Sequence, residues 1–205
     1  MSSRELSDSV LVADASAVIN LIASGAFKKV AATLEVPLRV VDSVAREIEA
    51  GRARGWKTPD EFEELVKVGL IEVVQLDEPS LACFESLVIG PAAETLDDGE
   101  AATIAYAESC GAVAVIDERK ARRLCGDRFP ALALQSTVDV LTNDVVVTTL
   151  GAEAVGDALF LALTVGRMRV RSVDIERVVN AIGTERSRLC TSLPERIRMP
   201  ADKTG

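Results

Sequence analysis

Residues Val10-Leu11-Val12-Ala13-Asp14 decide the fold, because a short apolar run here stops at a carboxylate. A run of this length bounded by a polar residue is typical of a buried β-strand. The same pattern returns near residue 113, where Val113-Ala114-Val115-Ile116 is followed by Asp117. The sequence therefore predicts two central strands, each of which ends at an acidic residue.

Between and around these runs, strand patterns alternate with helix patterns. Further strands are expected at 37–41, 71–76 and, as a short fifth strand, 131–134. Helices are expected at 17–23, 27–34, between Asp42 and Gly51, and at 58–68, 79–88, 97–108 and 119–125. This alternation predicts an α/β fold, with a parallel sheet of 4–5 strands and helices on both faces.

Helix starts are indicated by short polar side chains that can accept a hydrogen bond from the first turn. The expected capping residues, in chain order, are Ser16, Asp42 or Ser43, Thr58 before Pro59, and Asp97 or Asp98.

The character of the chain changes near residue 140. We expect one domain over residues 8–140 and a helical extension over residues 141–205. In the extension, residues 151–165 and 172–182 read as helices, joined by the basic linker Arg167-Met168-Arg169-Val170-Arg171. This extension either packs back onto the sheet, binds a partner or forms a dimer surface.

Composition excludes several classes of protein. No apolar run approaches the roughly 18 to 20 residues of a membrane span, so a cytoplasmic location is expected. The four cysteines form no CxxC pair, which argues against zinc or redox chemistry. A net charge of −9 argues against a general nucleic-acid coat protein, but residues 119–128 form a local basic path that a phosphate backbone could follow.

Four acidic residues are expected to meet at one edge of the sheet. Asp14 and Asp117 follow strands, and the carboxyl ends of parallel strands share one crevice. Glu47 and Glu100 lie in helices that can face the same crevice. Carboxylates gathered in this way repel one another unless a cation is present. The chain has no histidine, and oxygen ligands alone suit Mg²⁺ or Mn²⁺.

Four motifs in this order resemble a PIN domain, over about residues 8–140. They are Asp14-Ala15-Ser16, Arg46-Glu47-Ile48, Asp97-Asp98-Gly99-Glu100 and Ile116-Asp117-Glu118-Arg119. The resemblance is closest to the prokaryotic branch with a DxGE motif, related to the toxins of VapBC toxin–antitoxin pairs. It implies a Rossmann-like three-layer α/β/α fold and a metal-dependent endoribonuclease. It also implies an RNA substrate, a homodimer and, for a toxin, an antitoxin partner.

Carried over residue by residue, the resemblance implies the ligands Asp14, Glu47, Glu100 and Asp117, with Asp97 as a further candidate and Asp98 a weaker one. Ser16 matches a small hydroxyl residue of the family. Independently of the resemblance, basic side chains after the last acid could contact the RNA backbone: Arg119, Lys120, Arg122 and Arg123. Trp56 either stacks on a base or packs within the protein. The stretch 51–95 is longer than in the compact toxins.

Three alternatives remain. A phosphatase of the haloacid-dehalogenase type also uses an aspartate after a strand, but it needs a second aspartate where Ser16 stands. A receiver domain would need a Ser/Thr and Lys pair after its strands, which we do not find. A catalytically silent interaction module would use the same fold to bind a partner through the extension.

Overall fold

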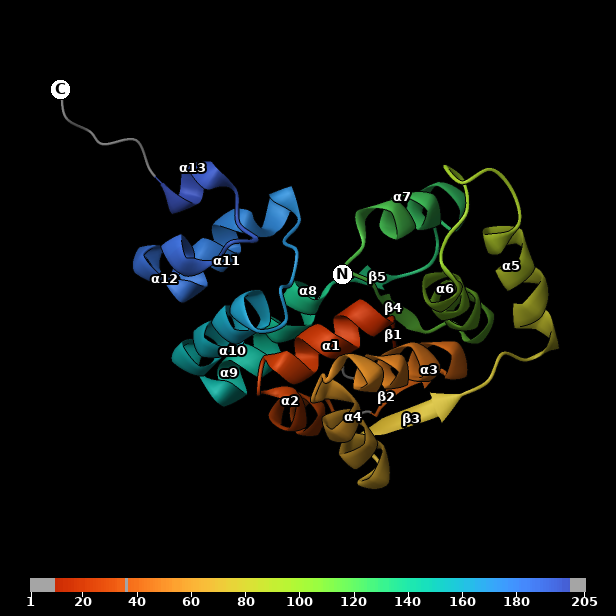
Figure 1. Cartoon of the computed structure of the whole chain (residues 1–205), viewed down its shortest axis with the longest axis horizontal. Coiled ribbons are helices and arrows are strands. Elements are labelled where there is room, and N and C mark those ends of the chain that lie inside the picture. The colour runs from red at the N-terminus through yellow and green to blue at the C-terminus, as the bar shows by residue number, and fades with distance from the viewer. Residues whose placement is uncertain (1–9, 36, 200–205) are drawn as a thin grey trace.

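A parallel β-sheet forms the centre of the computed structural model, which describes residues 10–35 and 37–199. Within those residues, five strands pair in the order β3-β2-β1-β4-β5, and every pairing is parallel. The strands are β1 (Leu11–Ala13), β2 (Leu38–Val41), β3 (Ile71–Val74), β4 (Val113–Val115) and β5 (Leu134–Gln135). Figure 1 shows helices on both sides of this sheet. The predicted α/β class is confirmed.

The two runs that end in aspartate form the middle of the sheet. β1 and β4 are fully buried and pair in register, Leu11 with Val113 and Ala13 with Val115. The backbone amide of Asp14 continues the ladder by donating to the carbonyl of Val115 at 3.2 Å. Asp14 and Asp117 therefore leave the sheet at the same edge, as expected.

The strand predicted at 131–134 is wrong in position by a few residues. The backbone of Ala114 bonds to Ala133, and that of Ile116 bonds to Gln135. This register places β5 at Leu134–Gln135, beside the end of β4 rather than beside its start.

Helices cover both faces because successive strand residues point to opposite sides. Leu11 and Ala13 face one apolar cluster, whereas Val12 faces another. The first cluster receives α1 (Ala15–Ala23), α2 (Phe27–Leu34), α3 (Asp42–Ala50) and α4 (Thr58–Lys67). The second receives α5 (Glu78–Val88), α6 (Asp98–Cys110) and α7 (Arg119–Arg128).

The predicted helix caps were partly wrong. Asp14, not Ser16, caps α1 by accepting from the amide of Ala17 at 2.7 Å, so the helix begins at Ala15. Asp97 takes the capping position of α6, but its side chain makes no capping hydrogen bond.

At α3 and α4 the expected caps lie inside the helices. Asp42 is the first residue of α3 and instead pairs with Arg46, one turn later, at 2.6 Å. Thr58 is the first residue of α4, because the carbonyl of Lys57 already accepts from the amides of Asp60 and Glu61.

The chain after β5 is helical and packs on the first apolar cluster. Leu159, Leu163 and Val178 belong to the same cluster as Leu11. The predicted helices at 151–165 and 172–182 appear as α10 (Ala152–Thr164) and as the short 3₁₀ turn η2 (Ser172–Asp174) followed by α11 (Ile175–Ile182). The sequence did not predict η1 (Gly51–Arg54), α8 (Thr137–Leu141), α9 (Asp144–Leu150), α12 (Thr184–Leu189) and α13 (Glu195–Arg198). The domain boundary at residue 140 stays a prediction.

An ion-pair cluster of Asp139, Arg171, Asp174 and Arg177 joins α8 to the extension. Arg171 binds Asp139 at 2.8 Å and also binds Asp174. Arg177 binds Asp139 at 2.6 Å and also binds Asp174. Each carboxylate therefore contacts two guanidinium groups, which fixes η2 and α11 against α8.

Among the residues described, no single helix has the length and apolar character needed to cross a membrane. Two sharply bent helix pairs, α1 with α2 and α9 with α10, reach that length and composition only in combination.

Candidate functional site

Asp14 is the most deeply placed acid of the site, with 2% of its surface exposed. One carboxylate oxygen, Oδ1, accepts from the amide of Ala17 and from the hydroxyl of Ser16 at 3.0 Å. Burial, followed by the negative charge of Asp117, raises the pKa of Asp14 to about 8. Two hydrogen bonds therefore hold the side chain in place, and no basic side chain among the described residues forms an ion pair with it.

Asp117 enters the same edge from the end of β4 and is held by three hydrogen bonds. Its Oδ2 accepts from the side-chain amide of Asn20 at 2.8 Å and from the hydroxyl of Thr137 at 2.6 Å. Its Oδ1 accepts from the backbone amide of Thr137 at 2.8 Å. Residues from α1 and α8 thus orient a carboxylate that follows β4.

Sequence reasoning missed Asn20 and Thr137. Asn20 lies four residues after Ser16, on the same helix face, so helical spacing was the available signal. Thr137 follows β5 as Asp117 follows β4, so the rule that polar residues gather after parallel strands could have identified it.

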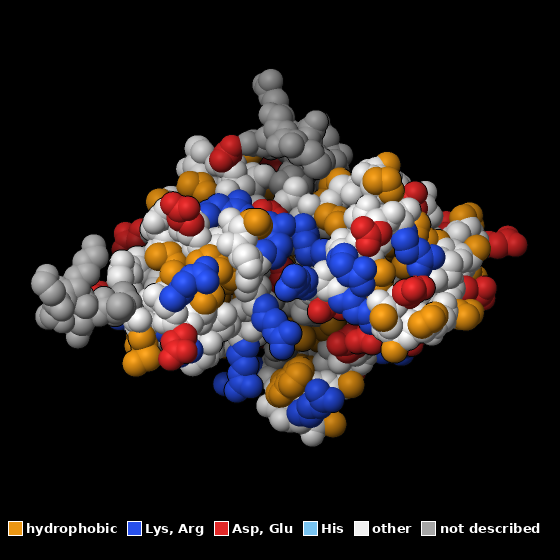
Figure 2. All heavy atoms as spheres, turned by 90° about the horizontal axis from the view of Figure 1, so that it is seen from above, with side chains coloured by type: hydrophobic (Ala, Val, Ile, Leu, Met, Phe, Trp, Pro, Cys, Tyr) orange, Lys and Arg blue, Asp and Glu red, His pale blue; other side chains and the backbone are white. Residues whose placement is uncertain are grey.

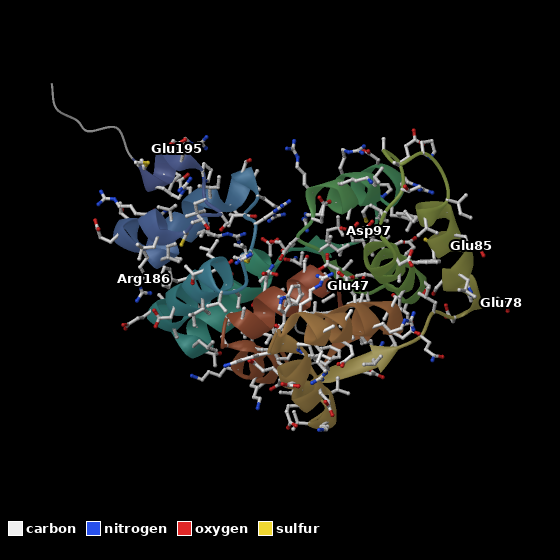
Figure 3. The ribbon with its side chains drawn as sticks, in the orientation of Figure 1. Glu47, Glu78, Glu85, Asp97, Arg186 and Glu195 are labelled. Carbon is white, nitrogen blue, oxygen red and sulfur yellow. The ribbon has the colours of Figure 1, made fainter. Side chains whose placement is uncertain are left out.

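Glu47 and Asp97 form a second part of the site, at the rim. Glu47 reaches from α3 towards the start of α6, as the labelled side chains in Figure 3 show. Glu47 is exposed, but partial desolvation by its neighbours, followed by the charge of Asp97, raises its pKa. Gly99 makes this approach possible, because a Cβ there would lie 2.9 Å from Glu47 Oε2.

Glu100 connects the rim to the deeper acids. Burial, followed by the charges of Glu118 and Asp97, raises the pKa of Glu100 to about 7. The charge of Glu100 in turn contributes to the raised pKa of Asp14. Glu118, which the sequence reasoning did not propose as a site residue, caps α7 by accepting from the amides of Lys120 and Ala121.

We call these acids, Asp14, Glu47, Asp97, Glu100 and Asp117, the acidic edge. Asp14 interacts electrostatically with Asp117 and Glu100, and Asp97 interacts with Glu47 and Glu100. Asp98, the weaker candidate, is exposed in the first turn of α6.

The basic candidates of α7 lie in different surroundings. Arg122 donates to the carbonyls of Ile116 and Gln135 at 2.9 and 2.6 Å, so it ties the ends of β4 and β5 together. Lys120 and Arg123 donate to the carbonyls of Ala92 and Ala93, in the loop before α6. Arg119 is exposed.

An open cavity of about 600 Å³ adjoins Asp117. Ser16, Asn20 and Glu118 line it from the sheet edge. Trp56, just before α4, and Thr58, the first residue of α4, line another side. The linker after α10 closes another side with residues 165–167 and Arg169. Figure 2 shows Lys and Arg side chains gathered at the centre of one face, with acidic atoms between them.

The acids fit a divalent cation by donor type and by charge. All are oxygen donors, as Mg²⁺ and Mn²⁺ prefer, and the raised pKa values of Asp14 and Glu100 reflect burial and mutual repulsion that a cation would relieve. Over residues 10–35 and 37–199, however, no three Asp, Glu or Cys side chains already stand close enough together to hold a metal ion.

A family model described as a PIN domain matches residues 10–143, which is more than half of the chain. No curated protein and no solved structure matched.

Proposed function

The chain belongs to the PIN-domain family, a family of typically metal-dependent nucleases, and on this premise we propose that it is an endoribonuclease acting at the acidic edge. The family membership leaves the haloacid-dehalogenase-type and receiver-domain alternatives without support. The proposed reaction is the hydrolysis of a phosphodiester bond in RNA with Mg²⁺ or Mn²⁺.

One observation carries the proposal: the acidic edge gathers carboxylates that form no ion pair with any residue that the structure describes, so that their ionised forms lack a paired cation. Burial and neighbouring carboxylates raise the pKa of Asp14 to about 8 and that of Glu100 to about 7. Strongly perturbed carboxylates in a crevice at the carboxyl ends of parallel strands are typical of functional sites. A purely structural role would favour pairing with the arginines that lie nearby.

The proposed roles of these residues in binding the cation follow from how deeply each side chain lies in the site. Asp14 and Asp117 would hold the cation directly, because both are fixed by hydrogen bonds at the sheet edge. Glu47 and Glu100 would contribute directly or through water, with Asp97 as a further ligand. A bound divalent metal would supply an activated water and charge neutralisation for the phosphoryl group. Ser16 would position Asp14 through its 3.0 Å hydrogen bond.

The RNA would contact basic side chains around the edge. Arg119 is exposed to solvent and would contact a phosphate of the RNA. Lys120 and Arg123 would contribute positive charge while their hydrogen bonds hold the loop before α6. Arg122 would act by positioning the end of β4, and with it Asp117. A role as the toxin of a toxin–antitoxin pair, with an antitoxin partner and a homodimer, is the corresponding proposal for the biological setting.

Calorimetric titration with Mn²⁺ tests the site, followed by cleavage of single-stranded RNA with Mn²⁺. Wild-type protein should bind Mn²⁺ and cleave RNA. Asp14→Asn, which keeps an oxygen able to cap α1, should lose both activities. Glu185→Gln serves as the matched control, because the Glu185 side chain is 84% exposed and far from the edge in sequence.

RNA cleavage that survives in Asp14→Asn would overturn the proposal. So would wild-type protein that neither binds Mn²⁺ nor cleaves RNA with Mn²⁺ present. That result would favour the interaction-module alternative, in which the fixed Asp117 is a structural residue.

A further inference from the structure

The cavity beside Asp117 is built from two segments that are far apart in the sequence. Trp56 and Thr58 come from the segment that leads into α4 and from its first residue, and residues 165–167 with Arg169 come from the linker after α10. Ser16, Asn20 and Asp117 form the inner side. An extended ligand in this cavity would therefore touch Asp117 of the acidic edge at one end.

The linker is fixed against the site at Gly166. A Cβ at Gly166 would lie 2.7 Å from the carbonyl oxygen of Ala162 and 2.8 Å from Oδ1 of Asn20. The same Asn20 donates to Asp117 through its amide nitrogen. Only a residue without a side chain can pass so closely over α1. Asn20 therefore contacts both the linker, at Gly166, and the carboxylate of Asp117.

The linker presents two arginines outwards on either side of a buried anchor. Met168 is buried, and its amide donates to the carbonyl of Ala162 at 2.9 Å. Arg167 and Arg169 are exposed, and both line the cavity. Neither forms an ion pair with any residue that the structure describes. Arg167 also adopts a positive φ of 58°, which is uncommon for a residue with a side chain.

Trp56 supplies an aromatic surface opposite the linker. Its ring packs on Gly51, where an added Cβ would lie 2.6 Å from the ring, yet 45% of the residue remains exposed. The guanidinium of Arg54 lies 5.3 Å from the ring centroid. Arg54 also acts electrostatically on Glu47, so positive charge continues from Trp56 to the acidic edge.

We propose that this cavity is a subsite for one nucleotide of single-stranded RNA, with the base stacked on Trp56 and the backbone phosphates held by Arg167 and Arg169. The proposal deepens the nuclease function and rests on it for the choice of RNA. An exposed aromatic ring beside unpaired arginines is the combination that binds single strands. The negatively charged strand complements the arginines and would lead from them to the acids.

The single tryptophan makes the subsite directly observable, since all tryptophan fluorescence comes from Trp56. The probe is a mixed-sequence single-stranded RNA of about ten nucleotides, within the range of site sizes for such proteins. Binding is measured in EDTA, so that no cleavage occurs. The RNA should quench Trp56 fluorescence, and the same sequence as a duplex should bind more weakly, because its bases are not free to stack.

Variants separate stacking from charge, and their binding is measured by the anisotropy of labelled RNA. Trp56→Ala should weaken binding roughly tenfold or more, as loss of one base stack does, and Trp56→Phe should retain most of it. Arg167→Ala with Arg169→Ala should lower the slope of log affinity against log salt by about 1.4, for two lost phosphate contacts. Arg188→Ala with Arg196→Ala removes the same charge from exposed positions of α12 and α13 and is the control.

The subsite is wrong if RNA leaves Trp56 fluorescence unchanged, or if the paired linker variant and its control lose affinity equally. Equal binding of single strand and duplex would also overturn it. Quenching by RNA in a protein that fails to cleave would support the subsite while refuting the nuclease proposal. RNA cleavage together with unchanged RNA binding in Trp56→Ala and in the paired linker variant would support the nuclease proposal while refuting the subsite.

Discussion

Two groups of carboxylates are connected to α8, one through Thr137 and the other through Asp139, and their surroundings shift carboxylate pKa values in opposite directions. Within the residues that the structure describes, no ion pair joins an arginine to a carboxylate of the acidic edge, and burial raises the pKa of Asp14 to about 8. The ion-pair cluster gathers Asp139 and Asp174 with two arginines. Burial alone would raise the pKa of Asp139, but hydrogen bonds from Arg177 and Ser136 and the charge of Arg171 outweigh it and lower that pKa.

The difference separates function from architecture. Arginines are available at the edge, yet Arg122 bonds to backbone carbonyls instead of to the carboxylates of Asp14 or Asp117. α8 serves both groups, because Thr137 orients Asp117 while Asp139, two residues later, anchors the extension. We infer that the cluster stabilises the fold, whereas at the edge ionisation of Asp14 and Glu100 is unfavourable and, in the proposed function, would become favourable when a cation binds.

The largest effect is expected from Asp14→Asn, which changes one carboxylate of the acidic edge. RNA cleavage should fall about 10³-fold, equivalent to about 4 kcal/mol of transition-state stabilisation. Without metal, the free energy of unfolding should stay within about 1 kcal/mol of wild type near neutral pH, where Asp14 is mostly protonated. It should exceed that of wild type above about pH 8, because the amide keeps the cap and carries no charge. Cleavage rates and urea unfolding check both halves. A marked loss of stability would show that Asp14 is structural.

A substitution in the ion-pair cluster should instead lower the stability of the fold. Asp139→Ala leaves Arg171 and Arg177 without one of their two carboxylates and removes the capping box of α8. Because the Asp139 side chain is only 19% exposed, the expected cost is about 2–3 kcal/mol of unfolding free energy. Glu185→Ala breaks an exposed pair and should cost less than about 0.5 kcal/mol. Urea unfolding of both variants measures the contrast, and equal costs would refute it.

The sequence could predict the edge but not the cluster. Asp14 and Asp117 follow short apolar runs, and the rule for parallel strands brings such residues together. Asp139 meets Arg171 and Arg177 from 32 and 38 residues away, through helices whose placement no local pattern specifies. α8 and α9 escaped prediction because five to seven residues hold too little periodicity. The hydrogen bond from Asn20 to Asp117, 97 residues away, was missed although the helical spacing of Asn20 from Ser16 was available as a signal.

Adding the cation should remove the main difference between the two groups. If Mn²⁺ binds only the folded protein, a concentration of about 100 times its Kd raises the unfolding free energy by about 2.7 kcal/mol. Wild type and Asp139→Ala should gain equally, whereas Asp14→Asn should gain little. Thermal unfolding with and without Mn²⁺ measures these gains. A full gain in Asp14→Asn would place the cation elsewhere.

The two groups should also give opposite dependences of stability on pH in EDTA. Asp14 and Glu100 have folded-state pKa values of about 8 and about 7, above their ordinary 3.8 and 4.5. Their contribution is complete below the ordinary values and is lost as pH rises through the folded ones. Asp139, with its lowered pKa, contributes above 3.8 and loses that contribution as pH falls further.

Urea unfolding across this range tests the signs. Metal-free wild type should lose stability between about pH 5 and about pH 8, and Asp14→Asn should lose less. Asp139→Ala should keep the loss at high pH while showing a smaller loss in acid. The same high-pH slope in Asp14→Asn as in wild type would mean that other groups cause it.

The smallest effect is expected at the rim, where Gly99→Ala would displace the Glu47 carboxylate without removing a charge. The added methyl group would lie 2.9 Å from Glu47 Oε2 and 3.5 Å from Val44, so the flexible carboxylate must move and the helices need not. Stability should change by less than about 1 kcal/mol, since alanine also favours the helix. Gly126→Ala, at a helical position with nothing within 4 Å, is the control and should leave cleavage unchanged. If Glu47 belongs to the site, Gly99→Ala should lower RNA cleavage roughly tenfold, as small misplacements of site groups do, and equal activity in both variants would exclude Glu47 from it.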